Sequence, residues 1–178
     1  MEPKPRSLTT NSLYFGILAG AAMIVYSLIL YIADAYMITG LNYIGYLLLI
    51  GGMIWGTVEY RKKYSGGFLT YGKAFSSCFM IGLFAGILAS VYMFLFAQVI
   101  HPGFVQELLD RSQEQIIART PDLSDEDLET AMAWTRRFTS PIMMMIWSFI
   151  MYLIASAVFA LVIAIFLKKE DKSLNATM

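Results

Sequence analysis

Charged residues are scarce in this sequence: they make up 15% of its 178 residues, whereas hydrophobic residues make up 58%. A soluble domain usually has about 25% charged and about 45–50% apolar residues. The thirteen Lys and Arg residues are matched by thirteen Asp and Glu residues, so the basic surplus of a nucleic-acid-binding protein is missing. This composition excludes a soluble enzyme, a disordered chain and a nucleic acid as partner.

Cysteine and histidine each occur once, as Cys78 and His101. A lone cysteine excludes a disulfide scaffold. A metal site needs about three or four protein ligands, and a Cys–His catalytic pair needs the two groups in contact. Cys78 is predicted near the middle of an apolar segment that ends at His101, so the two residues are far apart. We therefore predict that the protein is not an enzyme and has no catalytic residue, no metal and no cofactor.

Charges are absent from four long intervals of the sequence, and each interval exceeds the roughly 20 apolar residues needed to cross a bilayer. Lipid cannot satisfy backbone N–H and C=O groups, so a spanning segment is a helix unless it belongs to a barrel. Residues 142–147 do not alternate between apolar and polar as barrel strands do. We therefore predict transmembrane helices at about residues 12–33, 41–58, 73–100 and 141–167.

The predicted fold class is an all-α, polytopic membrane protein. A single domain over residues 1–178 contains a bundle of four transmembrane helices and a short helical extracytoplasmic loop at residues 101–139. The first apolar run is longer than the roughly 7–15 residues of a signal-peptide core, so we predict that it is retained as a membrane helix.

The basic residues are distributed unequally between the two sides of the predicted spans. Nine of the thirteen lie at the N-terminus, between the second and third spans, or after the fourth. Lys and Arg stay in the cytoplasm, which predicts a multi-pass membrane protein with both termini cytoplasmic. Arg61-Lys62-Lys63 directly follows the second span, where it has a topological role. Three residues fall short of the cluster of about 4–8 that binds anionic lipid.

The segment from His101 to Thr139 predicts two short amphipathic helices separated at Pro121. Ser124 is followed three residues later by an acid, as in a capping box at a helix N-terminus. The two helices either rest on the outer membrane face or form a ligand or partner site. His101, which precedes Pro102, and Asp34, at the outer end of the first span, are the residues of a candidate outer-face site.

Pairs of glycines at four-residue spacing occur in three of the predicted spans. Such spacing lets helices approach closely, because van der Waals packing is the main attraction between helices in lipid. Packing within the chain is a more economical explanation than dimerisation, since four helices are available. The predicted helix-packing residues are Gly16, Gly20, Gly52, Gly56, Gly82 and Gly86.

Several short motifs occur in a characteristic order along the chain. They are Gly67–Phe75 before the third span, His101-Pro102-Gly103-Phe104 after it, Leu123–Glu129 in the loop, and Ser140-Pro141 at the start of the last span. Over about residues 13–168 the chain resembles a family of uncharacterised four-helix integral membrane proteins, a domain of unknown function common in Bacteroidetes-type bacteria. The resemblance implies an inner-membrane location and brings no known activity, substrate or catalytic residue. Where the family often has an acidic residue, this chain has His101.

Two functions of different classes follow from these features. The first is a non-enzymatic structural or assembly component, whose partners are the lipid bilayer and a membrane protein or a second copy of the chain. The alternative is a small transporter or pore, suggested by the match of Gly16-x3-Gly20-x5-Tyr26 with Gly82-x3-Gly86-x5-Tyr92. An intramembrane enzyme is the weakest hypothesis, because the predicted spans contain no ionisable residue in their interiors.

Overall fold

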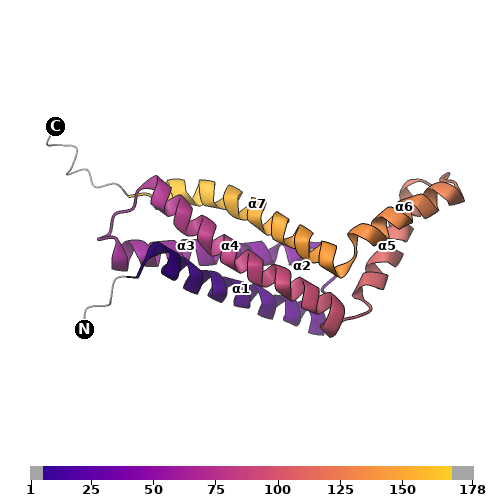
Figure 1. The fold of residues 1–178 in the computed structure, drawn as a ribbon, viewed down its shortest axis with the longest axis horizontal. Helices are drawn as coiled ribbons and strands as arrows, with labels where there is room; N and C mark the ends of the chain where they lie inside the picture. Colours follow the sequence, from indigo (N-terminus) through magenta and orange to yellow (C-terminus); the bar gives the residue numbers. More distant parts are fainter. Residues whose placement is uncertain (1–5, 170–178) are drawn as a thin grey trace. The chain divides into compact units, whose positions relative to one another are not determined.

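A computed structural model describes residues 6–169, which are almost entirely helical (Figure 1). The elements are α1 (Leu8–Ile32), α2 (Thr39–Asn42), α3 (Ile44–Tyr64), α4 (Tyr71–Leu95), a π-helix η1 (Phe96–Ile100), α5 (Phe104–Arg119), α6 (Asp125–Phe138) and α7 (Pro141–Leu167). Within the described residues, the only β-pairing is an isolated antiparallel bridge between Leu69 and Lys169. The all-α prediction is therefore confirmed.

Within residues 6–169, four helical segments are long and apolar enough to cross a membrane: Leu8–Ile32, Gly40–Tyr64, Tyr71–Ile100 and Pro141–Leu167. The fourth has the predicted bounds, and the first begins four residues before the predicted start. In the second, α3 continues six residues beyond the predicted end at residue 58. The prediction stopped at the first charge, whereas Glu59 and Lys63 are spaced four residues apart and form an ion pair that supports another helical turn.

The chain divides into two compact units, each of which is described by itself. The first lies within Met1–Ala89 and Met151–Met178, and the second is Ser90–Ile150. The boundaries fall inside α4 and α7.

The start of α1 follows from its sequence. Ser7 has an extended backbone, and its side-chain oxygen accepts a hydrogen bond from the backbone N–H of Thr10 at 3.1 Å. This bond satisfies one of the N–H groups that have no partner in the first turn of a helix. The helix ends at Ile32, and the Ala33 N–H donates to the Ile29 carbonyl at 3.0 Å.

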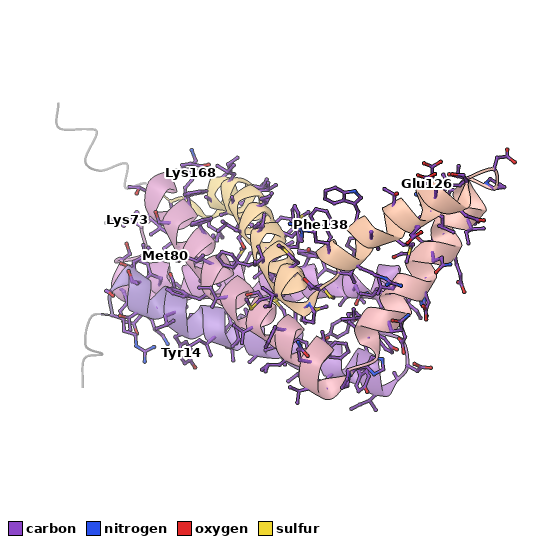
Figure 2. The ribbon with its side chains drawn as sticks, turned by 45° about the vertical axis from the view of Figure 1, so that its right-hand side comes forward. Tyr14, Lys73, Met80, Glu126, Phe138 and Lys168 are labelled. Atoms are coloured by element: carbon purple, nitrogen blue, oxygen red, sulfur yellow. The ribbon has the colours of Figure 1, made fainter. Side chains whose placement is uncertain are left out.

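The first unit has a core of medium-sized and small side chains from α1, α3, α4 and α7. Its buried residues are Phe15, Ala19, Met23, Leu49, Met53, Cys78, Ile81, Ala85, Ala89, Ala160 and Ile163. Large apolar side chains also cover the outside of these helices, as the stick view in Figure 2 illustrates at Tyr14. Trp55, Val158 and Phe166 are likewise exposed. A helix that is apolar all round is typical of a membrane span, because its outer face meets lipid.

The second unit contains the hairpin of α5 and α6, which pack against each other. Phe104 and Leu109 of α5 and Met132 of α6 are buried, so each amphipathic helix turns one apolar face inward. The Ser124 side-chain oxygen accepts from the Asp127 N–H at 3.2 Å and donates to the Asp127 carboxylate at 2.7 Å. The helix start predicted at Ser124 is therefore confirmed.

Candidate functional site

The candidate site of the first unit is the set of surfaces along which its helices meet. The glycines of α1 lie against α4. A Cβ atom built on Gly16 would lie 2.6 Å from the Phe84 Cβ and 2.9 Å from the Ile81 carbonyl oxygen. One built on Gly20 would lie 3.0 Å from the Leu88 side chain. Distances under about 3 Å leave no room for a side chain, so α1 and α4 approach to backbone contact.

The glycines of α3 lie against α1 and α4. A Cβ on Gly52 would lie 2.6 Å from the Ala19 Cβ. A Cβ on Gly56 would lie 2.7 Å from both the Phe15 Cβ and the Ile81 Cδ1. The small residues of α3 therefore make space for side chains of two neighbouring helices.

The glycines of α4 also lie against α7. A Cβ on Gly82 would overlap the Ser156 side chain and the end of Met53, and one on Gly86 would lie 2.9 Å from the Tyr152 Cβ. The six glycines singled out in the sequence thus lie at contacts among four helices of one unit. Other glycines differ: no atom of the described residues lies within 4 Å of a Cβ built on Gly51 or Gly72.

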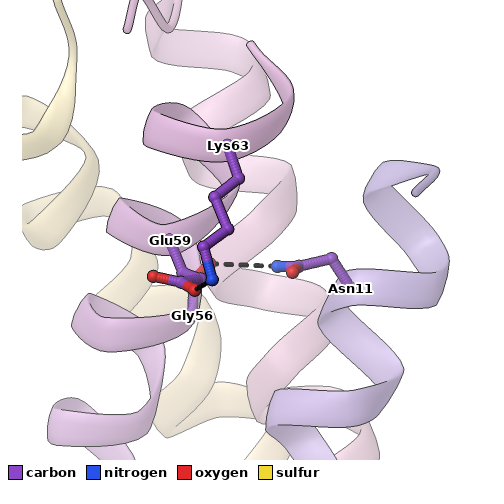
Figure 3. A network of polar contacts seen from close by, with 4 residues as sticks. All are labelled: Asn11, Gly56, Glu59 and Lys63. Atoms are coloured by element: carbon purple, nitrogen blue, oxygen red, sulfur yellow. Dashed lines mark hydrogen bonds and ion pairs between the residues drawn. The ribbon is translucent and has the colours of Figure 1, made fainter. Parts of the chain in front are cut away.

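A group of polar side chains is buried where α1, α3 and α4 meet. The Asn11 amide donates from Nδ2 to the Gly56 carbonyl at 3.0 Å and is 1% exposed (Figure 3). The Ser12 hydroxyl donates to the Ser77 carbonyl at 3.4 Å. Both bonds join α1 to another helix, and a buried amide or hydroxyl without such a partner would be costly in lipid.

The same group includes Thr57 of α3 and the adjacent Ser77 and Cys78 of α4. The Thr57 hydroxyl donates to the Ser77 Oγ at 2.9 Å and lies 3.2 Å from the Cys78 Sγ. All three residues are fully buried. None of these side chains is charged, and each has a partner on a neighbouring helix. We define the polar core cluster as these five residues: Asn11, Ser12, Thr57, Ser77 and Cys78. Its contacts can hold α1, α3 and α4 in register.

The sequence analysis named Cys78 only as a lone cysteine far from His101, and it did not identify Asn11, Ser12 or Thr57 as members of a buried polar group. The predicted first span began at residue 12, which placed Asn11 outside the membrane. A signal was nevertheless present, because Asn11 and Ser12 continue the helical face of Phe15, Gly16 and Ala19 at spacings of three and four residues. In the described residues, Ser156 has the only buried side-chain oxygen without a hydrogen-bond partner.

Beside the polar core cluster, the last turns of α3 carry charges. Glu59 and Lys63 form an ion pair, drawn with Asn11 and Gly56 in Figure 3. Both residues are at least partly exposed. This places the ionisable groups of α3 at the end of the helix and not in its middle, as expected where an apolar span meets water.

His101 lies in the second unit, directly after the π-helix η1. Its Nε2 atom lies 2.9 Å from the Glu107 Oε1, and its ring packs near Phe96 and Phe104 with centroid distances of 6.2 and 6.3 Å. Phe96 and Phe104 are buried. A π-helix followed by His101-Pro102 ends α4 and turns the chain into α5, which fits the predicted role of His101 at a helix end.

Asp34, the other residue of the candidate outer-face site, belongs to the first unit. Its φ of +54° is the only positive value among the non-glycine residues that the structure describes. Asp is one of the few residues that adopts this conformation readily. The Asp34 N–H donates to the Tyr31 carbonyl at 3.1 Å, so Asp34 forms the turn that ends α1.

The described residues contain no group of three or more His, Cys, Asp or Glu side chains that could hold a metal ion. Comparison with known proteins gives one match. A family model described as a protein of unknown function (DUF4199) matches residues 14–169. Neither the comparison with curated proteins nor the comparison with solved structures gives a match.

Proposed function

Because the chain belongs to the DUF4199 family of proteins of unknown function, which supplies no activity to carry over, we propose a function from the geometry of the helices. The protein acts as an integral membrane protein with a non-enzymatic, structural role. Its four long helices form a close-packed bundle that serves as an assembly component for a second membrane protein or a second copy of itself.

One observation carries this proposal: the surfaces between the helices are filled. At Gly16, Gly52, Gly56 and Gly82, a single added carbon would lie within 3 Å of a neighbouring helix. The side chains of the polar core cluster are each bonded to a neighbouring helix. This packing supports a role as a rigid scaffold, since close packing and hydrogen bonds between helices hold membrane helices together.

The outer surface of the helices is the part available to a partner. Trp55 of α3 is 58% exposed and Tyr14 of α1 is 53% exposed, whereas Phe15 beside them is buried. The Phe15 and Trp55 rings are in edge-to-face contact with centroids 5.4 Å apart, which fixes the direction of the exposed indole. Large, fixed aromatic side chains of this kind are frequent anchors in protein interfaces.

The orientation in the membrane is also part of the proposal. The excess of Lys and Arg at the N-terminus, between α3 and α4, and after α7 supports both termini on the cytoplasmic side of a bacterial inner membrane. Reporter fusions to the C-terminus would test this orientation. A reporter active only outside the cytoplasm should be silent there, and an active one would reverse the topology.

Site-specific photocrosslinking tests the assembly role. A photoreactive phenylalanine analogue replaces Trp55 or Tyr14 in the native membrane, and the matched control replaces the buried Phe15. We expect the exposed positions to crosslink to one partner protein or a second copy in stoichiometric yield, and the control position to crosslink only within the chain. Crosslinks to lipid alone, together with a monomer in mild detergent, would contradict the assembly role.

Liposome flux assays test the alternative of a small transporter or pore. The purified protein is reconstituted and challenged with monovalent ions, protons and small uncharged solutes. We expect no movement above that of empty liposomes. Reproducible flux above that of empty liposomes would favour transport and remove the structural proposal.

A further inference from the structure

Basic side chains from four separate segments gather at one end of the first unit. In the sequence, Arg61-Lys62-Lys63 stands as a group of three. In the fold, the end of α3, the start of α4, the end of α7 and the start of α1 lie at the same end of the unit (Figure 1). Lys73 and Lys168 are labelled at this end in Figure 2. The basic-end cluster consists of Arg6, Arg61, Lys62, Lys63, Lys73, Lys168 and Lys169.

The connection between α3 and α4 is fastened to the end of α7. Gly66 and Gly67 have φ values of +61° and +85°, which glycine adopts without the steric cost of a side chain, and they turn the chain back after α3. Leu69 then pairs with Lys169 through two backbone hydrogen bonds of 2.8 Å each. Leu69 is 2% exposed, so the bridge is anchored in the core. This pairing holds Lys168 and Lys169 beside the connection.

Arg61 adds a second link between α3 and α7. Its Nη1 atom donates to the Leu167 carbonyl at 2.9 Å, one of the carbonyls that have no partner within the last turn of a helix. The planar guanidinium has five N–H donors, so one bond leaves further donors on the same group. The Lys169 ammonium lies 5.8 Å from the centre of the Phe68 ring. Arg61 and Lys169 are thus held in place by contacts within the unit.

The charge at this end is strongly positive. Among the described residues at this end of the unit, the acidic residue is Glu59, which already forms an ion pair with Lys63. Glu170 and Asp171 follow in the sequence, outside the described residues. Seven basic residues fall within the range of about 4–8 at which a cluster next to a membrane span attracts anionic lipid.

Apolar surface lies directly beside these cations. Phe166 is 79% exposed on the last turn of α7, two residues before Lys168, and Phe68 is 40% exposed next to the bridge. A ligand that fits both the cations and the apolar surface has two parts. Its phosphate binds the guanidinium and ammonium groups, and its hydrocarbon chains pack against the apolar face. A free phosphate would use only the first feature.

We propose that the basic-end cluster, held together by the Leu69–Lys169 bridge and the Arg61–Leu167 hydrogen bond, binds the headgroup of an anionic phospholipid whose acyl chains lie along the end of α7. The proposal rests on membrane insertion, as put forward above, but not on the assembly role. A failure to bind lipid would therefore leave the crosslinking result unaffected.

The test is a lipid titration of the purified full-length protein in neutral detergent, followed by native mass spectrometry. Phosphatidylglycerol, phosphatidylcholine and glycerol 3-phosphate are compared; the last has an anionic phosphate but no acyl chains. We expect saturable binding of phosphatidylglycerol and at least tenfold weaker binding of the other two. Equal binding of phosphatidylcholine would overturn the headgroup site, and equal binding of glycerol 3-phosphate would overturn the lipid as ligand.

Charge variants locate the site. Lys73 and Lys168 are exposed, so the double variant Lys73→Gln/Lys168→Gln should fold normally. We expect its affinity for phosphatidylglycerol to fall about 25-fold, because the loss of each charge should weaken binding about fivefold. The matched control, Arg111→Gln/Arg119→Gln, removes two exposed charges from α5 and should leave binding unchanged. Equal losses in both variants would show a general charge effect and no site.

Discussion

Gly82 of α4 and Ser156 of α7 face each other so closely that no side-chain atom fits between them. Ser156 is fully buried, and its hydroxyl has no hydrogen-bond partner among residues 6–169. The missing side chain at Gly82 lets the Ser156 side chain lie directly against the backbone of α4, where close packing adds to the dispersion attraction between the helices.

Replacing Gly82 with alanine should therefore destabilise the fold. The new methyl group meets Ser156 and Met53, and overpacking of this kind costs about 1–3 kcal/mol. Unfolding in mixed micelles of mild detergent and dodecyl sulfate measures the change. Gly72→Ala is the matched control in α4, because no atom of residues 6–169 lies within 4 Å of its built Cβ. The control should be neutral or slightly stabilising, and equal losses in both variants would contradict the packing role.

Asn11→Ala should weaken the contact between α1 and α3. The variant loses the 3.0 Å bond from Nδ2 to the Gly56 carbonyl, and hydrogen bonds between membrane helices contribute about 1 kcal/mol. The same unfolding experiment measures the loss. Thr9→Ala, at an exposed position of the first turn, should leave the free energy of unfolding unchanged. If Asn11→Ala were also neutral, Asn11 would have no part in holding the helices together.

Cys78 provides a chemical readout of the polar core cluster. Its thiol is fully buried, so we expect a maleimide to label it only when the helices separate. Thr57→Ala removes the 3.2 Å contact with the Cys78 Sγ and the bond to Ser77. Labelling should become about fivefold faster, which corresponds to one hydrogen bond of about 1 kcal/mol.

The control for this experiment is Thr9→Ala, at an exposed position in the first turn of α1. It should label at the rate of the unaltered protein. Rapid labelling of the unaltered protein in detergent would show that the cluster opens readily and is not a rigid part of the core.

Ser124→Ala should loosen the start of α6. The variant loses the hydrogen bond that the Asp127 N–H donates to the Ser124 Oγ at 3.2 Å, and loss of such a cap costs about 1 kcal/mol. Amide hydrogen exchange in the first turn of α6 should become faster. Ser124→Asp should restore slow exchange, because a carboxylate also caps a helix. If both variants exchanged alike, the side-chain cap would be irrelevant.

The sequence was informative wherever one residue type decides local structure. Ser124 was recognised as a helix start because a hydroxyl followed by an acid three residues later satisfies the first N–H groups. The end of α3 was placed too early because the prediction stopped at the charge of Glu59. An ion pair with Lys63 extends the helix there, and such pairing depends on side-chain geometry as well as composition.

The candidate site was only partly visible in the sequence. Four-residue spacing identified glycines such as Gly16 and Gly82, but it did not say which helix each one meets. Asn11 was missed because a polar residue next to a predicted span boundary is normally exposed. Its burial depends on the Gly56 carbonyl, 45 residues further along the chain.

The sequence by itself determined that this protein is all-α, with four apolar helices separated by clusters of charge. Composition and charge spacing are enough for this conclusion, because a long uncharged segment in lipid forms all its backbone hydrogen bonds internally only as a helix. Only the tertiary structure decided which helix faces meet and which cations gather beside Lys169. Helices that are apolar on every side give no periodic signal of their buried face, and contacts such as Arg61 with Leu167 join residues far apart in the chain.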